Sequence, residues 1–120
     1  MPRERRRSAA TLPAALREPD YSSDDGRFEW GLKKAAQNFQ DHAISFPDAA
    51  TVFDDPLVRD EPDGGHYDEE RYTAVGESAD GKLLRVTYCH RDERIRIISA
   101  RKLDPKDRRA YRNATGRRQR

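Results

Sequence analysis

The spacing of hydrophobic residues changes along this chain from a helical to an alternating pattern. Between residues 31 and 42 it is helical, because apolar residues recur at Leu32, Ala36, Phe39 and Ala43. Residues three or four apart share one face of a helix, so this stripe predicts an amphipathic helix over residues 31–42 that buries it. Three polar residues repeat with the same spacing on another side of that helix: Lys34, Asn38 and His42.

A second helix is predicted almost directly after the first. Ser45 can cap its start, and Asp48 three residues later completes a capping box. Its expected buried stripe consists of Phe46, Ala49, Ala50 and Phe53. Asp55 precedes Pro56 and therefore resists helical geometry, so the helix should end there.

Alternation replaces the helical period after residue 70 and predicts strands. We expect strands over 70–78, 82–89 and 94–101, with a tight hairpin turn at Asp80-Gly81 and a short edge strand over 57–61. Asp104, followed by Pro105 and by Asp107 at the third position, is a typical helix start.

The order of helix, helix, three or four strands and helix predicts an α+β fold. Consecutive hairpins make the sheet antiparallel, with helices on one face and the other face open. We expect residues 1–27 to be a flexible extension, 28–112 the folded domain and 113–120 a basic tail. The open face would carry Arg85, Arg94 and Arg96, which makes it a plausible phosphate surface.

Charge is distributed unevenly along the 120 residues. The formal net charge is +2, but the net charge is −9 over residues 28–81 and +10 over residues 82–120. A concentrated cation attracts polyanions, of which phosphate backbones are the commonest, although a solvated basic face or an acidic protein partner would fit too. No apolar run is long enough for a membrane helix or a signal peptide, so a cytoplasmic protein is expected.

Three ordered segments resemble a known family. They are Phe28-Glu29-Trp30 with Lys34, Asn38, His42 and the run 52–56; Glu70-Arg71-Tyr72 with Val75-Gly76; and the run 94–101. This pattern resembles the BrnT toxins of bacterial type II toxin–antitoxin systems, which are similar to RelE-type ribonucleases. The chain departs from the family at Gly31, where Asp is usual, and at Ala43, where Gly is usual. Ala43 should then adopt a left-handed conformation that costs about 1 kcal/mol.

The resemblance implies a toxin that cleaves RNA without a metal or other cofactor and so stops growth. It also implies a hetero-oligomer with a BrnA-type antitoxin, which binds DNA, so that the toxin would contact DNA only indirectly. Independently of the resemblance, no His or Cys pair has the spacing of metal ligands, and Cys89 is expected to be a packed thiol.

Metal-free RNA cleavage needs a base for the ribose 2′-OH, cations that hold the phosphate, and an acid for the leaving oxygen. Arg71 and Arg101, on predicted strands, are the leading phosphate ligands, with salt bridges as the alternative. Glu70 could be the base, could orient Arg71 or could be purely structural. His42 could transfer protons or simply complement the helix dipole. The expected RNA-binding residues are Lys34, Arg85, Arg94 and Arg96.

Two other functions remain compatible with the sequence. The chain could be a non-catalytic regulator that binds nucleic acid, because the basic third would also serve that purpose. It could also be an inactive module that only sequesters an antitoxin. Cleavage of RNA by the purified chain distinguishes the first hypothesis from both.

Overall fold

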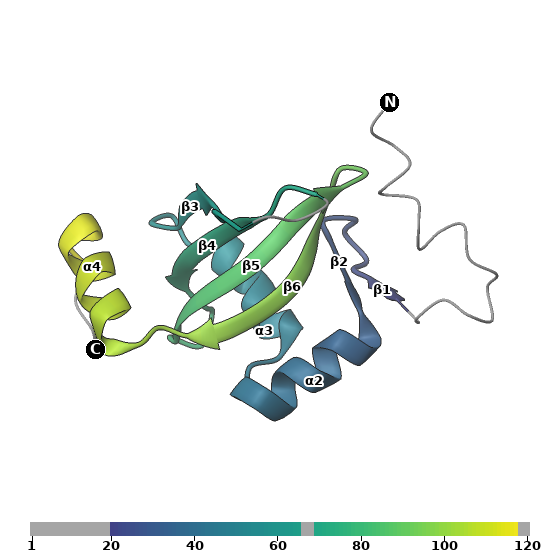
Figure 1. Ribbon diagram of the computed structural model, residues 1–120, viewed down its shortest axis with the longest axis horizontal. Coiled ribbons are helices and arrows are strands. Elements are labelled where there is room, and N and C mark those ends of the chain that lie inside the picture. Colours follow the sequence, from purple (N-terminus) through teal and green to yellow (C-terminus); the bar gives the residue numbers. More distant parts are fainter. Residues whose placement is uncertain (1–19, 66–68, 118–120) are drawn as a thin grey trace.

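The computed structural model describes residues 20–65 and 69–117, and Figure 1 labels its elements. The strands are β1 (Asp20–Ser22), β2 (Phe28–Gly31), β3 (Arg59–Pro62), β4 (Tyr72–Glu77), β5 (Leu83–Arg91) and β6 (Arg94–Lys102). The helices are α2 (Leu32–His42), α3 (Phe46–Ala50), the 3-10 turn η2 (Thr51–Asp54) and α4 (Pro105–Thr115). Of the expected extension and basic tail, residues 1–19 and 118–120 lie outside the described residues.

The six strands form one mixed sheet in the order β1-β2-β6-β5-β4-β3. β2 runs parallel to β6, and every other neighbouring pair is antiparallel. The predicted fold class was therefore wrong. Two strands precede the helices, so the chain does not begin its fold with two helices, and the sheet is neither three- to four-stranded nor purely antiparallel.

The first two strands give little signal in the sequence. β1 has three exposed residues and no alternation. β2 is four residues long, with Phe28 and Trp30 buried, and it leads directly into α2. Its parallel partner lies far away in sequence, because Phe28 pairs with Ile95. Tyr21 stacks on Trp30 with ring centroids 4.7 Å apart, and this contact joins β1 to the core.

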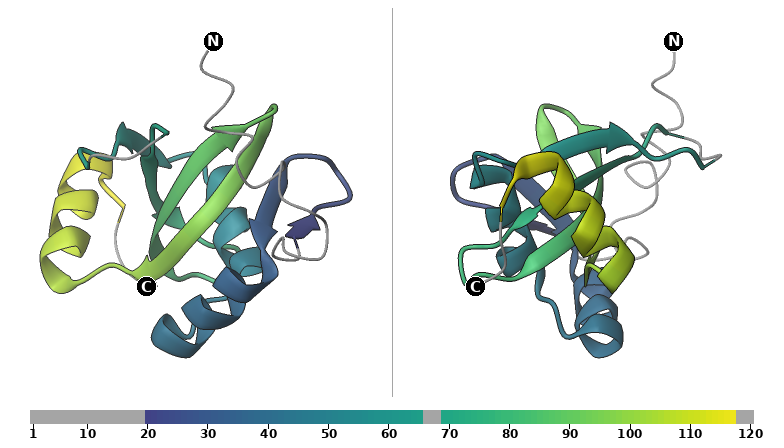
Figure 2. Two further views of the ribbon diagram at one scale, coloured as in Figure 1. Left: turned by 45° about the vertical axis from the view of Figure 1, so that its right-hand side comes forward. Right: turned by 90° about the vertical axis from the view of Figure 1, so that its left-hand side faces the viewer.

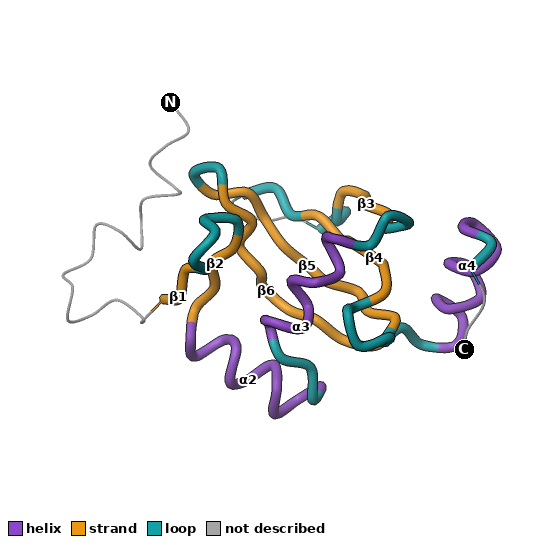
Figure 3. The backbone as a smooth tube through the Cα atoms, turned by 180° about the vertical axis from the view of Figure 1, so that it is seen from behind, coloured by secondary structure: helices purple, strands orange, loops and turns teal. Residues whose placement is uncertain are grey.

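Helices α2 and α3 cover one face of the sheet, whereas α4 stands apart from them at the far end (Figures 2 and 3). The main core lies under α3 and η2, where Phe46, Ala49 and Val52 meet Leu84 and Val86. A second, smaller cluster holds α4. The face of β5 and β6 that points away from α2 and α3 is the open face.

The apolar stripe of α2 is not buried, contrary to the prediction. Leu32 is 46% exposed and Phe39 is 55% exposed. The residue that α2 buries is Asn38, whose side-chain amide donates to the carbonyl oxygens of Ala100 (2.9 Å) and Ile44 (3.0 Å) and accepts from the N–H of Ala100 (3.0 Å). The helix therefore attaches to β6 through a buried amide rather than through its hydrophobic stripe.

The helix boundaries follow the expected local chemistry. Ser45 caps α3 by accepting a hydrogen bond from the N–H of Asp48 at 3.2 Å, and Asp104 caps α4 by accepting one from the N–H of Asp107 at 2.7 Å. Ala43 ends α2 with φ of 60°, so the expected left-handed conformation is confirmed. Gly31 caps α2 without a side chain to accept a hydrogen bond.

A buried carboxylate, Asp55, ties the C-terminal end of the described chain to the core. Its side chain is 2% exposed and accepts hydrogen bonds from Arg117 (2.7 and 3.0 Å), from Tyr111 (3.2 Å) and from the N–H of Glu77 (2.7 Å). Burial alone would raise the pKa of Asp55, but Arg117 and the backbone N–H groups of Glu77 and Leu57 hold that pKa at about 2. Asp55 also needs a glycine next to it, because a Cβ on Gly76 would lie 2.9 Å from its Oδ2.

Candidate nucleic-acid interface and active site

Strand alternation brings two arginines together on the open face. Leu84 and Val86 on either side of Arg85 are fully buried under the helices, so Arg85 projects from the opposite face. Arg101 follows the buried Ala100 and projects from the same face. Arg85 and Arg101 are directly opposed in the β5–β6 register. Two like charges in this position repel each other unless an anion lies close to both.

Asp107 of α4 is the carboxylate that lies close to both arginines. Its Oδ2 is 3.6 Å from Nε of Arg85 and 3.6 Å from Nη2 of Arg101. Both distances exceed the usual length of a charged N–H···O hydrogen bond, which is about 2.7–2.9 Å. Nε of Arg85 is buried and has no hydrogen-bond partner, and Arg101 donates one bond to the carbonyl of Lys102. The buried Nε itself is closed to a ligand, but the side chains of Arg85 and Arg101 are 28% and 42% exposed on the open face.

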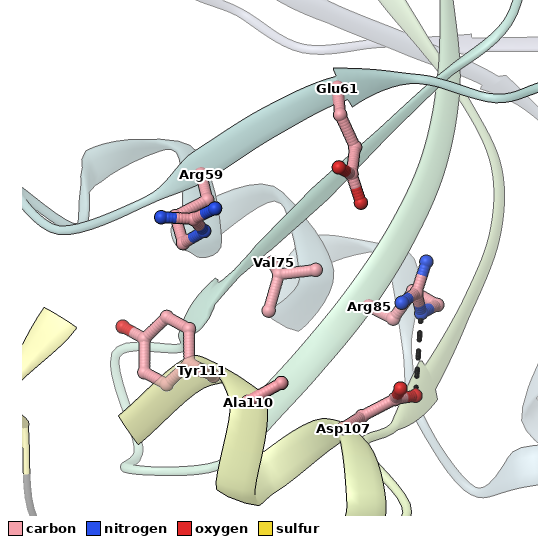
Figure 4. Close-up of a pocket in the computed structure, with 7 residues that line it drawn as sticks. All are labelled: Arg59, Glu61, Val75, Arg85, Asp107, Ala110 and Tyr111. Carbon is pink, nitrogen blue, oxygen red and sulfur yellow. Dashed lines mark ion pairs between the residues drawn. The ribbon is translucent and has the colours of Figure 1, made fainter. Parts of the chain in front are cut away.

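A pocket of about 240 Å³ opens beside this pair, between α4 and strands β3, β4 and β5 (Figure 4). Its lining residues are Arg59, Glu61, Val75, Arg85, Asp107, Ala110 and Tyr111. Figure 4 shows the side chains of Arg85 and Asp107 meeting at one side of the pocket, with Arg59 and Glu61 across from them on β3. We call Arg85, Arg101 and this pocket the α4 end of the open face.

The opposite end of the open face, next to the β5–β6 turn, carries three arginines that are hydrogen-bonded within the protein. Arg91 donates to Glu69 at 2.6 Å and Arg94 to Ser22 at 2.8 Å. Arg96 donates to Glu29 at 2.8 Å and to Asp20 at 3.1 Å. We call this group the hairpin end. Arg94 and Arg96 were expected to bind RNA, and the structure places both against internal partners.

Glu70 and Arg71 lie directly before β4, away from Arg101. Val75 pairs with Arg85, and Arg71 lies four residues before Val75 in the sequence. At about 3.4 Å per residue, the backbone of Arg71 is roughly 14 Å along the strand direction from that of Val75. Glu70 accepts a hydrogen bond from the Tyr72 hydroxyl at 2.9 Å, and this bond raises the pKa of Tyr72. The structure therefore does not bring Arg71 and Arg101 together as one clamp.

His42 and Lys34 are exposed on α2, the helix that covers the other face of the sheet. His42 is the last residue of that helix, where a cation complements the helix dipole. A base at this position would act on the opposite side of the sheet from Arg85 and Arg101. Of the predicted site residues, the structure thus groups Arg85 with Arg101 and leaves Arg71, Glu70, His42 and Lys34 elsewhere.

Sequence reasoning missed the part that Asp107 plays at the arginine pair. Its position three residues after Asp104 explained it fully as part of a helix start, and nothing in the spacing connected it to β5 or β6. Arg59 and Glu61 were missed because the exposed edge strand β3 carries no strong alternating pattern. His90 was expected to be simply exposed. It is exposed, but its ring also contacts those of Tyr72 and Tyr88.

Cys89 is the packed thiol that was expected, since it is 1% exposed. Burial and the neighbouring Glu69 raise the pKa of this thiol to about 11, so it is not a nucleophile at neutral pH. Within residues 20–65 and 69–117, no group of three His, Cys, Asp or Glu side chains could hold a metal ion. The positive charge at the α4 end is that of guanidinium groups.

A comparison with solved structures finds a protein with a similar fold. The chain is similar to the ribonuclease toxin BrnT of Brucella abortus, known from a crystal structure at 1.1 Å resolution. The TM-score is 0.50 and the identity 20%, and the match covers 62% of this chain and 92% of that one. The chain thus shares the fold of that protein. A search of curated proteins finds no match.

The sequence itself identifies the family. Residues 30–107, more than half of the chain, match the family described as "Ribonuclease toxin, BrnT, of type II toxin-antitoxin system". The chain belongs to the BrnT toxin family, and the resemblance found in the sequence is confirmed. Members of a type II toxin family have an antitoxin partner, and a ribonuclease toxin acts on RNA. No helix in the described part of the chain is long and apolar enough to cross a membrane.

Proposed function

We propose that this chain is a metal-independent endoribonuclease that cleaves RNA to inhibit translation and growth. The observation that carries the proposal is the opposed pair Arg85 and Arg101, whose side chains project from the open face and whose ion pairs with Asp107, at 3.6 Å, are longer than hydrogen bonds. Two guanidinium forks can stabilise the negative charge that builds on a phosphate as it is attacked. The pair thereby supplies charge stabilisation of the kind that a metal ion provides in other nucleases.

The remaining arginines and lysines have a different part in this proposal. Arg71, farther along the open face, would hold the RNA backbone at a second point, and Lys34 and His42 would stay outside the site. Arg94 and Arg96 hold the sheet together through Ser22, Glu29 and Asp20 and would reach RNA only by giving up those bonds. Affinity for RNA should therefore depend mainly on the α4 end.

Incubation of the purified full chain with mRNA in excess EDTA tests the proposal. We expect cleavage by the natural sequence and a loss of about 100- to 1,000-fold in Arg101→Ala, because one well-placed donor is typically worth that much in rate. Arg94→Ala is the matched control, since it removes an arginine from the same strand that already bonds to Ser22. RNA that stays intact with the natural sequence would overturn the proposal, and binding without cleavage would favour a non-catalytic regulator.

The partner implied by the family is an antitoxin, and we propose that it is of the BrnA type, so that this chain reaches DNA only through it. A short open reading frame next to this gene that encodes a DNA-binding protein would support this. Co-expression of the two chains should restore growth and give one co-purifying hetero-oligomer. Toxicity that persists on co-expression, together with separate elution of the chains, would contradict it.

A further inference from the structure

The pair Arg85 and Arg101 needs a base next to it if it is to support cleavage at a ribose 2′-OH. The bases expected from the sequence do not meet this need, because His42 lies on the helix-covered side and Glu70 is hydrogen-bonded to Tyr72. Asp107 does meet it. Its carboxylate oxygen lies 3.6 Å from a nitrogen of each arginine and faces the pocket that both strands and helix line.

The cap of α4 and the packing of that helix together set the position of Asp107. At the start of α4, its backbone N–H is bonded to the capping side chain of Asp104, which leaves its own carboxylate out of the cap. Farther along α4, Tyr111 packs with Val75 and Leu103 and bonds to the buried Asp55. The carboxylate is thus carried on the capped first turn of a helix that Tyr111 attaches to the core, and a catalytic group needs such support.

The carboxylate of Asp107 also forms only long ion pairs within the protein. Its two ion pairs are longer than hydrogen bonds, its side chain is about a quarter exposed, and the adjoining volume of about 240 Å³ has room for one sugar–phosphate unit. Glu61 lines the same pocket, but it is exposed on the edge strand β3. Contacts between a base and its target are often long in the free enzyme and shorten when substrate binds.

We propose that Asp107 is the general base of the reaction, an inference that rests on the ribonuclease function proposed above. Asp107 takes the proton from the ribose 2′-OH as the 2′-oxygen forms a bond to phosphorus. Arg85 and Arg101 hold the phosphate oxygens while the bond from phosphorus to the 5′-oxygen breaks. The leaving 5′-oxygen takes a proton from water, and Asp107 later returns its proton to water. The products are a 2′,3′-cyclic phosphate and a 5′-hydroxyl end.

The test compares three variants of the full chain: Asp107→Asn, Asp107→Glu and Asp104→Asn. We expect Asp107→Asn to lower kcat by about 100-fold or more, as is typical for loss of a general base, while KM changes only a few-fold. Asp107→Glu should recover part of the rate, because it restores a carboxylate. Asp104→Asn should keep full activity, because asparagine caps a helix as well as aspartate does.

Two readouts separate catalysis from a purely structural role. Binding of a 2′-O-methyl RNA, which cannot be cleaved, should be equal or tighter in Asp107→Asn, since a negative charge is removed beside the arginines. The acidic limb of the pH–rate profile should disappear in the same variant. Loss of RNA binding or of the folded circular-dichroism spectrum in Asp107→Asn would show that Asp107 is structural and would overturn the proposal.

Other outcomes distinguish this inference from the function on which it rests. If the natural sequence cleaves RNA and Asp107→Asn cleaves it equally well or faster, Asp107 only occupies the arginine pair and the inference alone fails. Products that end in a 3′-hydroxyl and a 5′-phosphate would also refute it, because the 2′-oxygen would not be the nucleophile. If the natural sequence cleaves nothing, the ribonuclease proposal fails first and the inference with it.

Discussion

The two ends of the open face carry the same residue type in different surroundings. At the hairpin end, Arg91, Arg94 and Arg96 each donate a hydrogen bond of 2.6–2.8 Å to a side-chain oxygen. At the α4 end, Arg85 and Arg101 share one carboxylate oxygen at 3.6 Å from each. The difference teaches that the neighbouring elements decide whether an arginine on a strand is hydrogen-bonded within the protein or keeps only longer ion pairs.

The largest expected effect separates catalysis from stability at the two ends. Arg85→Ala should reduce RNA cleavage by about 100- to 1,000-fold with little change in the free energy of unfolding, because Arg85 forms no short hydrogen bond. Arg96→Ala should reduce cleavage only in proportion to the unfolded fraction. Single-turnover cleavage rates and urea unfolding of both variants check this. Equal losses of rate per folded molecule would erase the distinction between the ends.

The second effect concerns stability at the hairpin end. Arg96 and Glu29 are paired at 2.8 Å with side chains 18% and 15% exposed, so Arg96→Ala leaves a mostly buried carboxylate without its charged partner. We expect a cost of about 2 kcal/mol in the free energy of unfolding, measured by urea titration. Arg94→Ala, which removes a bond to the exposed Ser22, should cost less than about 0.5 kcal/mol. Similar costs for the two variants would contradict the description of this end.

The third prediction tests whether the buried Asp55 anchors α4 next to Arg85 and Arg101. The pKa of Asp55 is about 2 in the folded protein and near 3.8 when the group is unperturbed. Because its folded pKa is depressed, Asp55 contributes stability that is fully present above pH 4 and is lost as the pH falls through about 2. The loss should be about 2 kcal/mol. Urea unfolding between pH 7 and pH 2 measures it.

A variant assigns that acid sensitivity to Asp55. In Asp55→Asn the stability at neutral pH should already be reduced, and the part of the pH dependence between pH 4 and pH 2 that Asp55 causes should be absent. Asp80→Asn is the comparison, because the pKa of Asp80 is also held at about 2, by Lys82 and Ser78, but in an exposed turn where solvent screens the charges, so its share of the pH dependence should be smaller. An unchanged pH dependence in Asp55→Asn would refute this account of the anchor.

The smallest expected effect is a gain in stability from Ala43→Gly, and the stabilised protein could carry the variants of both the α4 end and the hairpin end. Ala43 has φ of 60°, a conformation that glycine adopts without the steric cost. Ala43→Gly should therefore stabilise the fold by up to about 1 kcal/mol, since relief of the strain outweighs the greater freedom of glycine in the unfolded chain. Thermal unfolding measures this, and the matched Ala36→Gly in the middle of α2 should destabilise by about 1 kcal/mol. Stabilisation by both substitutions, or by neither, would contradict the conformational argument.

Local chemistry made several elements predictable. The capping residues Ser45 and Asp104, the left-handed residue Ala43 and the strands around Leu84 and Val86 all depend on neighbours within a few residues. The family signatures were equally readable, because residue identity and order carry them. The arginines of the open face were also expected, since alternation fixes the face of each strand residue.

Burial within α2 could not be read from the same pattern. The apolar stripe with Leu32 and Phe39 satisfied every rule for a buried helix face, yet the sheet lies against Asn38 instead. An amide in the core is favourable only when its partners are already in place, and here they are the backbone groups of Ala100 and Ile44. Those partners are brought to Asn38 by the packing of β6, which helix periodicity does not describe.

The sequence by itself determined the helix and strand spacing of the central elements, the supply of arginines in the last third of the chain, and the family. Tertiary structure alone decided the parallel pairing of β2 with β6 and the placement of Asp107 between Arg85 and Arg101. The physical reason is the distance along the sequence over which each kind of interaction acts. Turns, caps and alternation act over a few residues, whereas the partner of a charge or of a strand edge depends on where distant segments pack.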